Sequence, residues 1–397
     1  MVNIEKKFIV LAILIRVLIM PWFYHPDIKT QHFHFQFLRQ GVFNIYEYIQ
    51  NNKSTLAYKD TFNYLPLTYL TFGSIQSLFS PILTDKFDFW INDWGSTQNT
   101  NPSMPHFLLI LKIPYLIADI LIAYILFKLY KNKKIVNIWL FNPISIYLIY
   151  IVGNFDIIPS FLTLLAFYLN KKNRYVTSYL IIGVAIALKM YPLMFVPFLV
   201  LNNKKIIIKQ SLLSLFSLLP LVIMAIPFLF TNSFSQAFLG SGLTQKIIEF
   251  KILNLPIFPL VYLIILANLF FSKKENRIEI AFLQTMLLFL GLVKFHAQWI
   301  LWFLPMIIVL FKQIKMQNIL VIFILILSLI YIFLLNDNYL FWGHLIPIDS
   351  EFVNQTSPHQ LIKLKLHQDS NTIQSQIHSL ILFLGTLTSL IYVKKNN

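Results

Sequence analysis

Apolar stretches alternate with short polar breaks along all 397 residues of the chain. Many of these stretches approach the ~20 apolar residues that an α-helix needs to cross a bilayer. The pattern therefore predicts an all-α, polytopic membrane protein that forms one domain over residues 1–397. We place about twelve crossings at residues 8–22, 106–127, 135–151, 157–170, 175–188, 191–202, 210–230, 253–271, 279–293, 297–311, 316–335 and 379–393.

Composition excludes several other classes of protein. Hydrophobic residues make up 57% of the chain and charged residues 12%, whereas a soluble domain carries about 25% charged residues. A single water-soluble globule is thereby excluded. The chain has no cysteine, which excludes disulfide frameworks, thiolate zinc sites and cysteine nucleophiles.

The formal net charge of +16 arises from clusters of lysine in the polar breaks. Seven clusters hold 19 of the 32 Lys and Arg residues, and the positive-inside rule places all seven, with both termini, in the cytoplasm. The excess charge thus marks orientation, and we expect no nucleic-acid partner. The clusters are Lys6 and Lys7; Lys128, Lys131, Lys133 and Lys134; Lys171, Lys172 and Arg174; Lys204, Lys205 and Lys209; Lys273, Lys274 and Arg277; Lys312 and Lys315; Lys394 and Lys395.

Three longer segments, 23–105, 231–252 and 336–378, then lie on the extracytoplasmic side. Residues 64–82 are apolar enough to resemble a crossing, but counting them as one would invert every later lysine cluster. We therefore predict a helix there that lies at the outer interface or re-enters from it. All nine histidines and twelve of the sixteen acids fall on or at the edge of this side, so the polar chemistry is expected there.

Two predicted hairpins, 175–188/191–202 and 279–293/297–311, are short for full crossings. Such hairpins would end below the outer surface and line an aqueous cavity, where irregular backbone is tolerated. The alternative is that the boundaries are misplaced by a few residues.

Three charges, Arg16, Lys112 and Asp119, lie inside predicted spans, where an ionisable group costs ~2.5 kcal/mol or more and suggests a function. Lys112 and Asp119 are seven residues apart and share one helix face. Asp119 could pair with Arg16 of the first span, and we favour a structural role for that pair.

Three further charges, Asp156, Lys189 and Lys294, lie at the outer ends of helices. Lys189 and Lys294 each occupy the turn of a short hairpin, at the mouth of the expected cavity. Two cations there would suit a phosphate or diphosphate arriving in the outer leaflet. The alternative is that both lysines extend to lipid headgroups.

Asp27 follows the first span within five residues and therefore lies close to the membrane surface. The next stretch, 32–41, alternates aromatic and polar residues, which suits an interfacial segment. Residues 58–66 add aromatic side chains suited to stacking on sugar rings. Asp27 could instead be a plain N-cap for the helix that follows.

Five segments in this order resemble the GT-C superfamily of glycosyltransferases that use polyprenyl-phosphate sugars. The resemblance is strongest to the GPI mannosyltransferase I catalytic subunit and to bacterial polyprenyl-phosphate-mannose-dependent mannosyltransferases. The segments are Arg16 to Asp27; Gly41 to Tyr46 with Phe62-Asn63-Tyr64-Leu65-Pro66; Lys112 with Asp119; Asn142-Pro143 and Gly153-Asn154-Phe155-Asp156, continuing to Lys189-Met190-Tyr191-Pro192; and Lys294-Phe295-His296-Ala297-Gln298-Trp299-Ile300-Leu301-Trp302.

The resemblance implies that Asp27 is the catalytic base, which removes the proton of the acceptor hydroxyl. Lys189 and Lys294, with His296 as an additional donor, would bind the leaving phosphate. Displacement by a single base would invert the anomeric configuration. Many relatives have a second acid beside the first, whereas Ile28 and Lys29 follow Asp27 here, which argues against a bound divalent metal.

The remaining expected contacts are with the substrates. Asp156 would position acceptor or sugar hydroxyls, although an ion pair with Lys189 is an equal alternative. Gln298, Trp299 and Tyr64 would line the pocket, although a tryptophan at an interface can also belong to an aromatic belt.

The expected function is transfer of a hexose, with mannose favoured, from a polyprenyl-phosphate donor to a glycan, glycolipid or protein acceptor. We expect no cofactor beyond this lipid-linked donor. The sequence bias toward Lys, Asn, Ile and Phe indicates an AT-rich genome, which favours a bacterial source. The expected location is therefore a bacterial plasma membrane. A multi-pass transporter or lipid flippase is the alternative, but such proteins usually show two similar halves, which this chain lacks.

Overall fold

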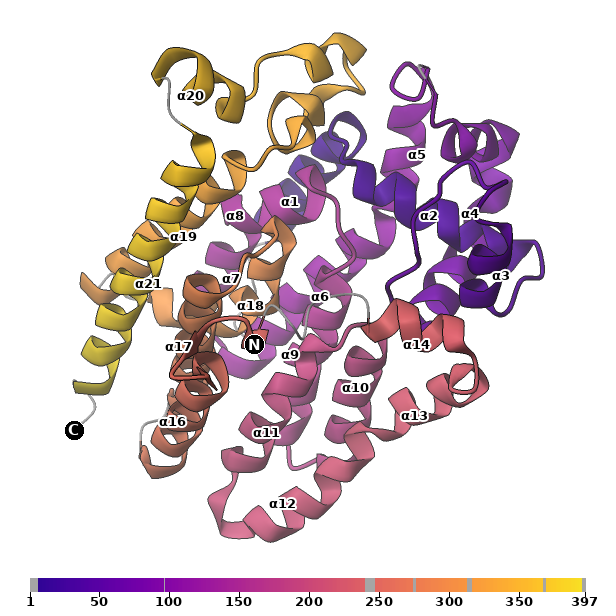
Figure 1. Ribbon diagram of the computed structural model, residues 1–397. Coiled ribbons are helices and arrows are strands. Elements are labelled where there is room, and N and C mark those ends of the chain that lie inside the picture. Colours follow the sequence, from indigo (N-terminus) through magenta and orange to yellow (C-terminus); the bar gives the residue numbers. More distant parts are fainter. Residues whose placement is uncertain are drawn as a thin grey trace.

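The computed structural model describes residues 6–95, 97–239, 247–273, 276–312, 316–366 and 369–394. Lys274, Lys315 and Lys395 of the lysine clusters, and His367, lie outside these ranges. The described residues are mostly helical, as predicted (Figure 1). Two short antiparallel strands, β1 (Lys251–Ile252) and β2 (Leu255–Pro256), form a small hairpin.

Every predicted span coincides with a helix or a run of short helices in the described residues. In chain order these are α1 (Lys6–Ile19) with η1 (Met20–Trp22); α5 (Met104–Leu111) with α6 (Ile113–Tyr130); α7 (Lys133–Leu140), α8 (Pro143–Ile146) and η2 (Tyr147–Ile151); α9 (Ile157–Lys171); α10 (Tyr175–Leu188); η3 (Tyr191–Phe195) with α11 (Val196–Asn202); η4 (Lys204–Ile206), α12 (Ile207–Ser214), η5 (Leu215–Ser217), α13 (Leu219–Ala225) and η6 (Ile226–Phe228); α16 (Ile257–Phe271); α17 (Arg277–Leu292); η7 (Ala297–Trp302), α18 (Leu304–Ile307) and η8 (Ile308–Lys312); α19 (Met316–Phe333); and α21 (Ser370–Lys394).

The segments between the predicted spans also form helices. They are α2 (Pro26–Arg39), α3 (Ile45–Asn52), α4 (Pro66–Asn92), α14 (Asn232–Leu239), η9 (Asn338–Leu340), η10 (Trp342–Leu345), η11 (Ser350–Asn354) and α20 (Pro358–Leu366).

Length and apolar composition qualify three of the described helices as membrane-spanning, or up to five if each of two bent pairs counts as one span. The three are Met104–Tyr130, Ile207–Phe228 and Ser370–Tyr392. Five further apolar helices have 10–17 residues and are shorter than the 18 residues that we require of a membrane-spanning helix. The number of twelve crossings therefore stays a prediction.

Large apolar side chains cover the outward faces of several of these helices. Exposed leucine, isoleucine, valine and phenylalanine residues recur on α1, α12, α13, α16, α19 and α21. Soluble monomers rarely expose contiguous apolar surface of this kind. The apolar faces and the helix composition fit an integral membrane protein.

Several lysine clusters lie at one end of the helix bundle. The carboxylate of Glu279, at the start of α17, accepts hydrogen bonds from Lys171 at 3.2 Å and from Tyr130 at 2.7 Å. Arg277 donates to the backbone oxygens of Leu201 and Asn202. These contacts join the ends of α6, α9 and α11 to the start of α17, which is the grouping that the lysine pattern predicts.

The segment after the first span turns sharply. The axis of α2 makes an angle of 80° with the preceding helix, and α2 packs along α4 (Figure 1). α4 contains all but the first two residues of the predicted interfacial stretch 64–82 and bends at Thr84, where φ is 63°. α4 is not among the helices that qualify as membrane-spanning.

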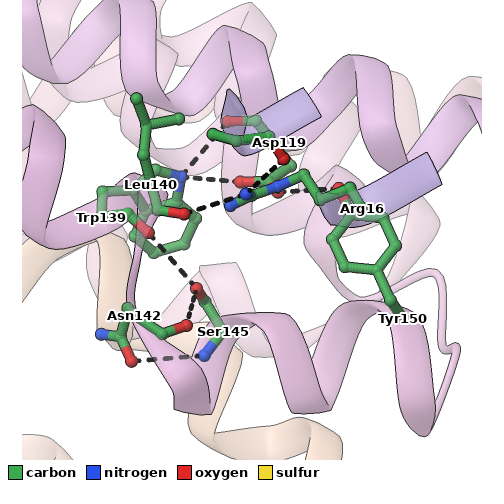
Figure 2. Close-up of polar contacts among 8 residues, drawn as sticks. Arg16, Asp119, Trp139, Leu140, Asn142, Ser145 and Tyr150 are labelled. Atoms are coloured by element: carbon green, nitrogen blue, oxygen red, sulfur yellow. Dashed lines mark hydrogen bonds and ion pairs between the residues drawn. The ribbon is translucent and has the colours of Figure 1, made fainter. Parts of the chain in front are cut away.

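A buried ion pair joins the first span to the rest of the bundle. Arg16 Nε donates to Asp119 Oδ2 at 2.6 Å, and both side chains are fully buried. Figure 2 shows that Trp139 and Tyr150 complete this cluster. Trp139 Nε1 and Tyr150 OH each donate to the Asp119 carboxylate at 2.7 Å. The structure thus supports a structural role for Arg16 and Asp119.

The third intramembrane charge, Lys112, fastens the start of the first loop to the bundle. Its ammonium group donates to the carbonyl oxygens of Met20, Phe23 and Tyr150, at 2.9, 2.6 and 2.7 Å. These three bonds use all the donors of an ammonium group. Lys112 therefore fixes where the chain leaves the first helix, only a few residues before Asp27.

Candidate functional site

A cavity of about 750 Å³ opens at the helix ends remote from Glu279. Four separate segments line it: the start of α2, residues 58–65, the turn after α10, and the stretch around the start of η7. Residues 335–340 of the last loop close its remaining side. Both short hairpins turn at this space, which we call the central cavity, as their lengths predict.

Asp27 lies in the first turn of α2 and faces the central cavity. The N-cap of α2 is His25, whose Nδ1 lies 3.2 Å from the backbone nitrogen of Asp27. Pro26 follows at the first helical position, where its missing N–H is tolerated. α2 begins at Pro26, which puts Asp27 at the second helical position. The alternative that Asp27 is the N-cap is therefore wrong, and its carboxylate is available to the cavity.

His25 lies between two carboxylates. Its Nδ1 is 3.4 Å from Asp27 Oδ1, and its Nε2 is 3.5 Å from Asp337 Oδ2. Burial disfavours a charged imidazole here, but the two carboxylates outweigh that cost and raise the pKa of His25 to about 10. When His25 is protonated, Nδ1 carries a hydrogen that faces the Asp27 carboxylate. In that state Nδ1 cannot accept a hydrogen bond from the backbone N–H of Asp27.

The same contacts act on the carboxylate of Asp27. Burial by itself would raise its pKa, but His25, and to a lesser extent His296 and Lys189, lower the pKa to about 2. Asp27 is therefore ionised at neutral pH. Its side chain keeps 37% of its surface exposed, so a ligand in the central cavity can reach it.

Asn154 contacts Asp27 from the opposite side. Its Nδ2 lies 3.4 Å from Asp27 Oδ2, a long hydrogen bond, and its Oδ1 accepts from the backbone N–H of Asp156 at 3.3 Å. The second contact determines which end of the amide faces Asp27. The preceding residue, Gly153, has φ of +68°, a conformation that glycine adopts without steric cost.

Lys189 borders the central cavity and forms an ion pair with Asp156. The distance from Nζ to Asp156 Oδ1 is 2.5 Å, and the Lys189 side chain is 14% exposed. Asp156 is fully buried, and its other oxygen accepts from Trp302 Nε1 at 2.9 Å. Of the two predicted roles for Asp156, the structure therefore provides the ion pair, and Asp156 does not line the cavity.

The other predicted substrate contacts surround this pair. Tyr64, His296, Gln298 and Trp299 all line the central cavity. The ammonium group of Lys189 lies 5.9 Å from the ring centre of Tyr64. The ring of His296 lies 5.0 Å from that of Trp299. A cation, an imidazole and aromatic faces therefore adjoin the Asp27 carboxylate.

Lys294 departs from the expected arrangement. It is exposed and is not among the residues that line the central cavity. The expectation that Lys294 faces the same cavity as Asp27 and Lys189 is therefore wrong.

The comparison with protein families identifies the chain's relatives. The model of glycosyltransferase family 87 matches residues 107–343, which is more than half of the chain. The chain belongs to glycosyltransferase family 87. Among curated proteins no match was found.

The family 87 match covers only part of the residues around the central cavity. It includes Asn154, Asp156, Lys189, His296 and Asp337, but it begins after the loop that carries Asp27. The family is of the GT-C type. The finer resemblance to the GPI mannosyltransferase I subunit stays a prediction.

Sequence reasoning about this family 87 chain missed three residues of the site: His25, Asn154 and Asp337. Asn154 could have been found from its place in Gly153-Asn154-Phe155-Asp156. Asp337 could have been found as an acid just beyond the predicted span 316–335. In the described part of the chain, no group of three or more His, Cys, Asp or Glu residues is arranged to hold a metal ion.

Proposed function

We propose that the protein transfers a hexose, most simply mannose, from a polyprenyl-phosphate donor to an acceptor hydroxyl. The transfer would take place on the extracytoplasmic face and invert the anomeric centre. One observation carries the proposal: the Asp27 carboxylate shares one cavity with Lys189 and His296. A base and two phosphate-binding groups are what such a displacement requires.

The anionic donor would enter the central cavity with its phosphate toward Lys189 and His296. An ammonium group has three N–H donors, and the ion pair with Asp156 uses one of them. That ion pair holds the ammonium group in place at the cavity wall. The polyprenyl chain remains in the bilayer, which keeps the anomeric carbon near the membrane surface.

Asp27 would accept the proton of the acceptor hydroxyl as its oxygen bonds to the anomeric carbon. The bond from that carbon to the phosphate oxygen breaks, and polyprenyl phosphate leaves with the electron pair. A carboxylate with pKa of about 2 is a weak base in the empty site. The donor phosphate would offset the cations that depress this pKa, and a like charge nearby raises the pKa of a carboxylate.

The decisive experiment supplies radiolabelled polyprenyl-phosphate mannose to membranes that contain the protein. We expect Asp27→Asn to reduce label transfer by about 10²–10⁴-fold, the range of general-base contributions. Asp85→Asn is the matched control, because Asp85 is an exposed acid of the same loop that does not line the cavity. Transfer by Asp27→Asn at the wild-type rate would contradict the proposed mechanism.

A further inference from the structure

A second, smaller cavity of about 430 Å³ adjoins the central one. We call it the side cavity. It lies between α3 and the segment 61–63 on one side and α14 on the other, and α3 and α14 pack together (Figure 1). The proposed transfer mechanism does not use it.

The side cavity has an apolar floor and a polar rim. Tyr46, Ile49 and Phe62 form the floor and are at most 4% exposed. The rings of Tyr46 and Phe62 pack at 5.7 Å. Such a floor can pack against the apolar C–H face of a sugar ring.

The rim carries polar side chains that are free to bind. Gln50, Lys53 and Gln236 line it and are exposed. Within the described residues, none of these three side chains takes part in a hydrogen bond or ion pair. An amide offers both donors and an acceptor, which is the chemistry that recognises hydroxyl-rich ligands.

The two cavities share a wall. Thr61 and Asn63 line both of them, and Thr61 Oγ1 donates to Asn63 Oδ1 at 2.9 Å. Tyr46 OH donates to the backbone oxygen of Tyr64 at 2.7 Å, and Tyr64 lines the central cavity. A ligand longer than one sugar could therefore continue from the central cavity into the side cavity.

We infer that the side cavity binds the sugar that precedes the reacting residue of the acceptor, so that the acceptor is an oligosaccharide of at least two units. This inference rests on the proposed function and names the acceptor class for the same site. The terminal sugar would present its hydroxyl to Asp27. The next sugar would lie on Tyr46 and Phe62, and Gln50 and Gln236 would bind its hydroxyls.

The test compares acceptors of different length with the purified full chain and radiolabelled polyprenyl-phosphate mannose. The acceptors are methyl α-mannoside and linear α-linked manno-oligosaccharides of two and three units. We expect kcat/KM for the disaccharide to exceed that for the monosaccharide by at least about tenfold, as two hydrogen bonds of ordinary strength would give. In Gln50→Leu/Gln236→Leu this ratio should fall toward one, through a higher acceptor KM.

The matched control is Gln355→Leu, an equal change at an exposed glutamine that lines neither cavity. It should leave the ratio at the wild-type value. Size-exclusion chromatography and thermal unfolding check that each variant folds. The inference would be wrong if the wild type used mono- and disaccharide equally well, or if the double variant kept the wild-type ratio of the two kcat/KM values. Either result would leave the proposed function unaffected.

If no acceptor becomes labelled, the proposed donor or sugar is wrong instead. Saturation-transfer NMR with the same disaccharide then decides the side cavity directly. A saturation-transfer signal of the disaccharide that the wild type shows and Gln50→Leu/Gln236→Leu loses would support binding in the side cavity. A signal that is absent in the wild type, or unchanged in the double variant, would overturn binding in the side cavity.

Discussion

The imidazole of His25 contacts the carboxylate of Asp337 across the mouth of the central cavity, with 3.5 Å between Nε2 and Oδ2. The contact joins the first loop to the last one. Because the other ring nitrogen contacts Asp27, the orientation of the proposed base depends on a residue near the far end of the chain. His25 is thus a positioning residue for Asp27.

The raised pKa of His25 predicts how stability depends on pH. A folded-state pKa of about 10, against 6.5 for the free side chain, means that the charged imidazole stabilises the fold fully below pH 6.5. That contribution declines as the pH rises toward 10. Asp27, Asp337, His344, His296 and Lys189 are the titratable groups around this contact.

Thermal unfolding of the detergent-purified protein between pH 6 and pH 10 measures this decline. His25→Asn keeps a side chain that can cap α2 but cannot carry the charge, so its unfolding temperature should change less over that range. Parallel curves for wild type and variant would show that His25 is neutral in the folded protein.

Lys189 and Lys294 should differ sharply in their effect on activity. Lys189→Met should lower kcat by about 10²–10³-fold, the loss typical when one stabilising donor is removed. Lys294→Met makes the same change outside the cavity and should leave kcat within about twofold of wild type, as expected for a surface substitution. Steady-state transfer assays with varied donor provide the measurement.

Lys189→Met also leaves Asp156 buried without its cation, which is destabilising. The double variant Lys189→Met/Asp156→Asn removes both charges and separates the two effects. It should recover much of the unfolding temperature but none of the activity. Recovery of activity would show that Lys189 acts only as the counter-ion of Asp156.

Asp119→Asn should destabilise the fold by about 3–5 kcal/mol, because it leaves the buried Arg16 without its counter-ion. Unfolding in detergent with added denaturant can measure the change. Arg16→Met/Asp119→Leu should remain destabilised, because the Tyr150 hydroxyl then lacks its acceptor, at about 1–3 kcal/mol, and Trp139 Nε1 keeps only the backbone oxygen of Asp119, at 3.3 Å. A double variant as stable as wild type would show that the cluster in Figure 2 contributes little.

Gly153→Ala should reduce activity through the position of Asn154. An added Cβ at Gly153 would lie 3.1 Å from Lys112 Cε, in a backbone with φ of +68°. Gly41→Ala is the matched control, because its φ is +82° but no atom lies within 4 Å of the added Cβ. Both variants should lose about 1–2 kcal/mol of stability from the left-handed backbone.

Only Gly153→Ala should also lower kcat, by about tenfold or more, because the contact from Asn154 to Asp27 shifts when the neighbouring turn moves. Transfer assays on the two variants, at a temperature where both are folded, make the comparison. Equal kcat in the two variants would show that Gly153 has no positioning role.

The sequence predicts the helices well because their signals are local. Apolar stretches and lysine clusters are properties of neighbouring residues, and each predicted span matches a helix or a run of short helices. Arg16 and Asp119 were also predictable as a pair, because charges within apolar spans require partners. The partners of Lys112 were not, since backbone carbonyls have no sequence signal.

The candidate site was predictable only in part. Asp27, Lys189 and His296 share the central cavity because each follows or precedes an apolar span on the same predicted side. The spacing does not encode the direction in which a turn sends its side chains, and so Lys294 was misplaced. It also does not encode contacts between distant loops, and so the contact of His25 with Asp337 was missed.

Tyr24 and His344 exchange two hydrogen bonds over a separation of 320 residues. The backbone N–H of Tyr24 donates to His344 O at 2.9 Å, and His344 Nδ1 lies 3.1 Å from Tyr24 O. A ribosome that adds about 5–20 residues per second needs roughly 16–64 s to make that length of chain. The segment next to Asp27 is therefore synthesised long before His344, with which it forms these bonds. A nascent chain that ends before His344 should lack the complete arrangement of residues around the central cavity.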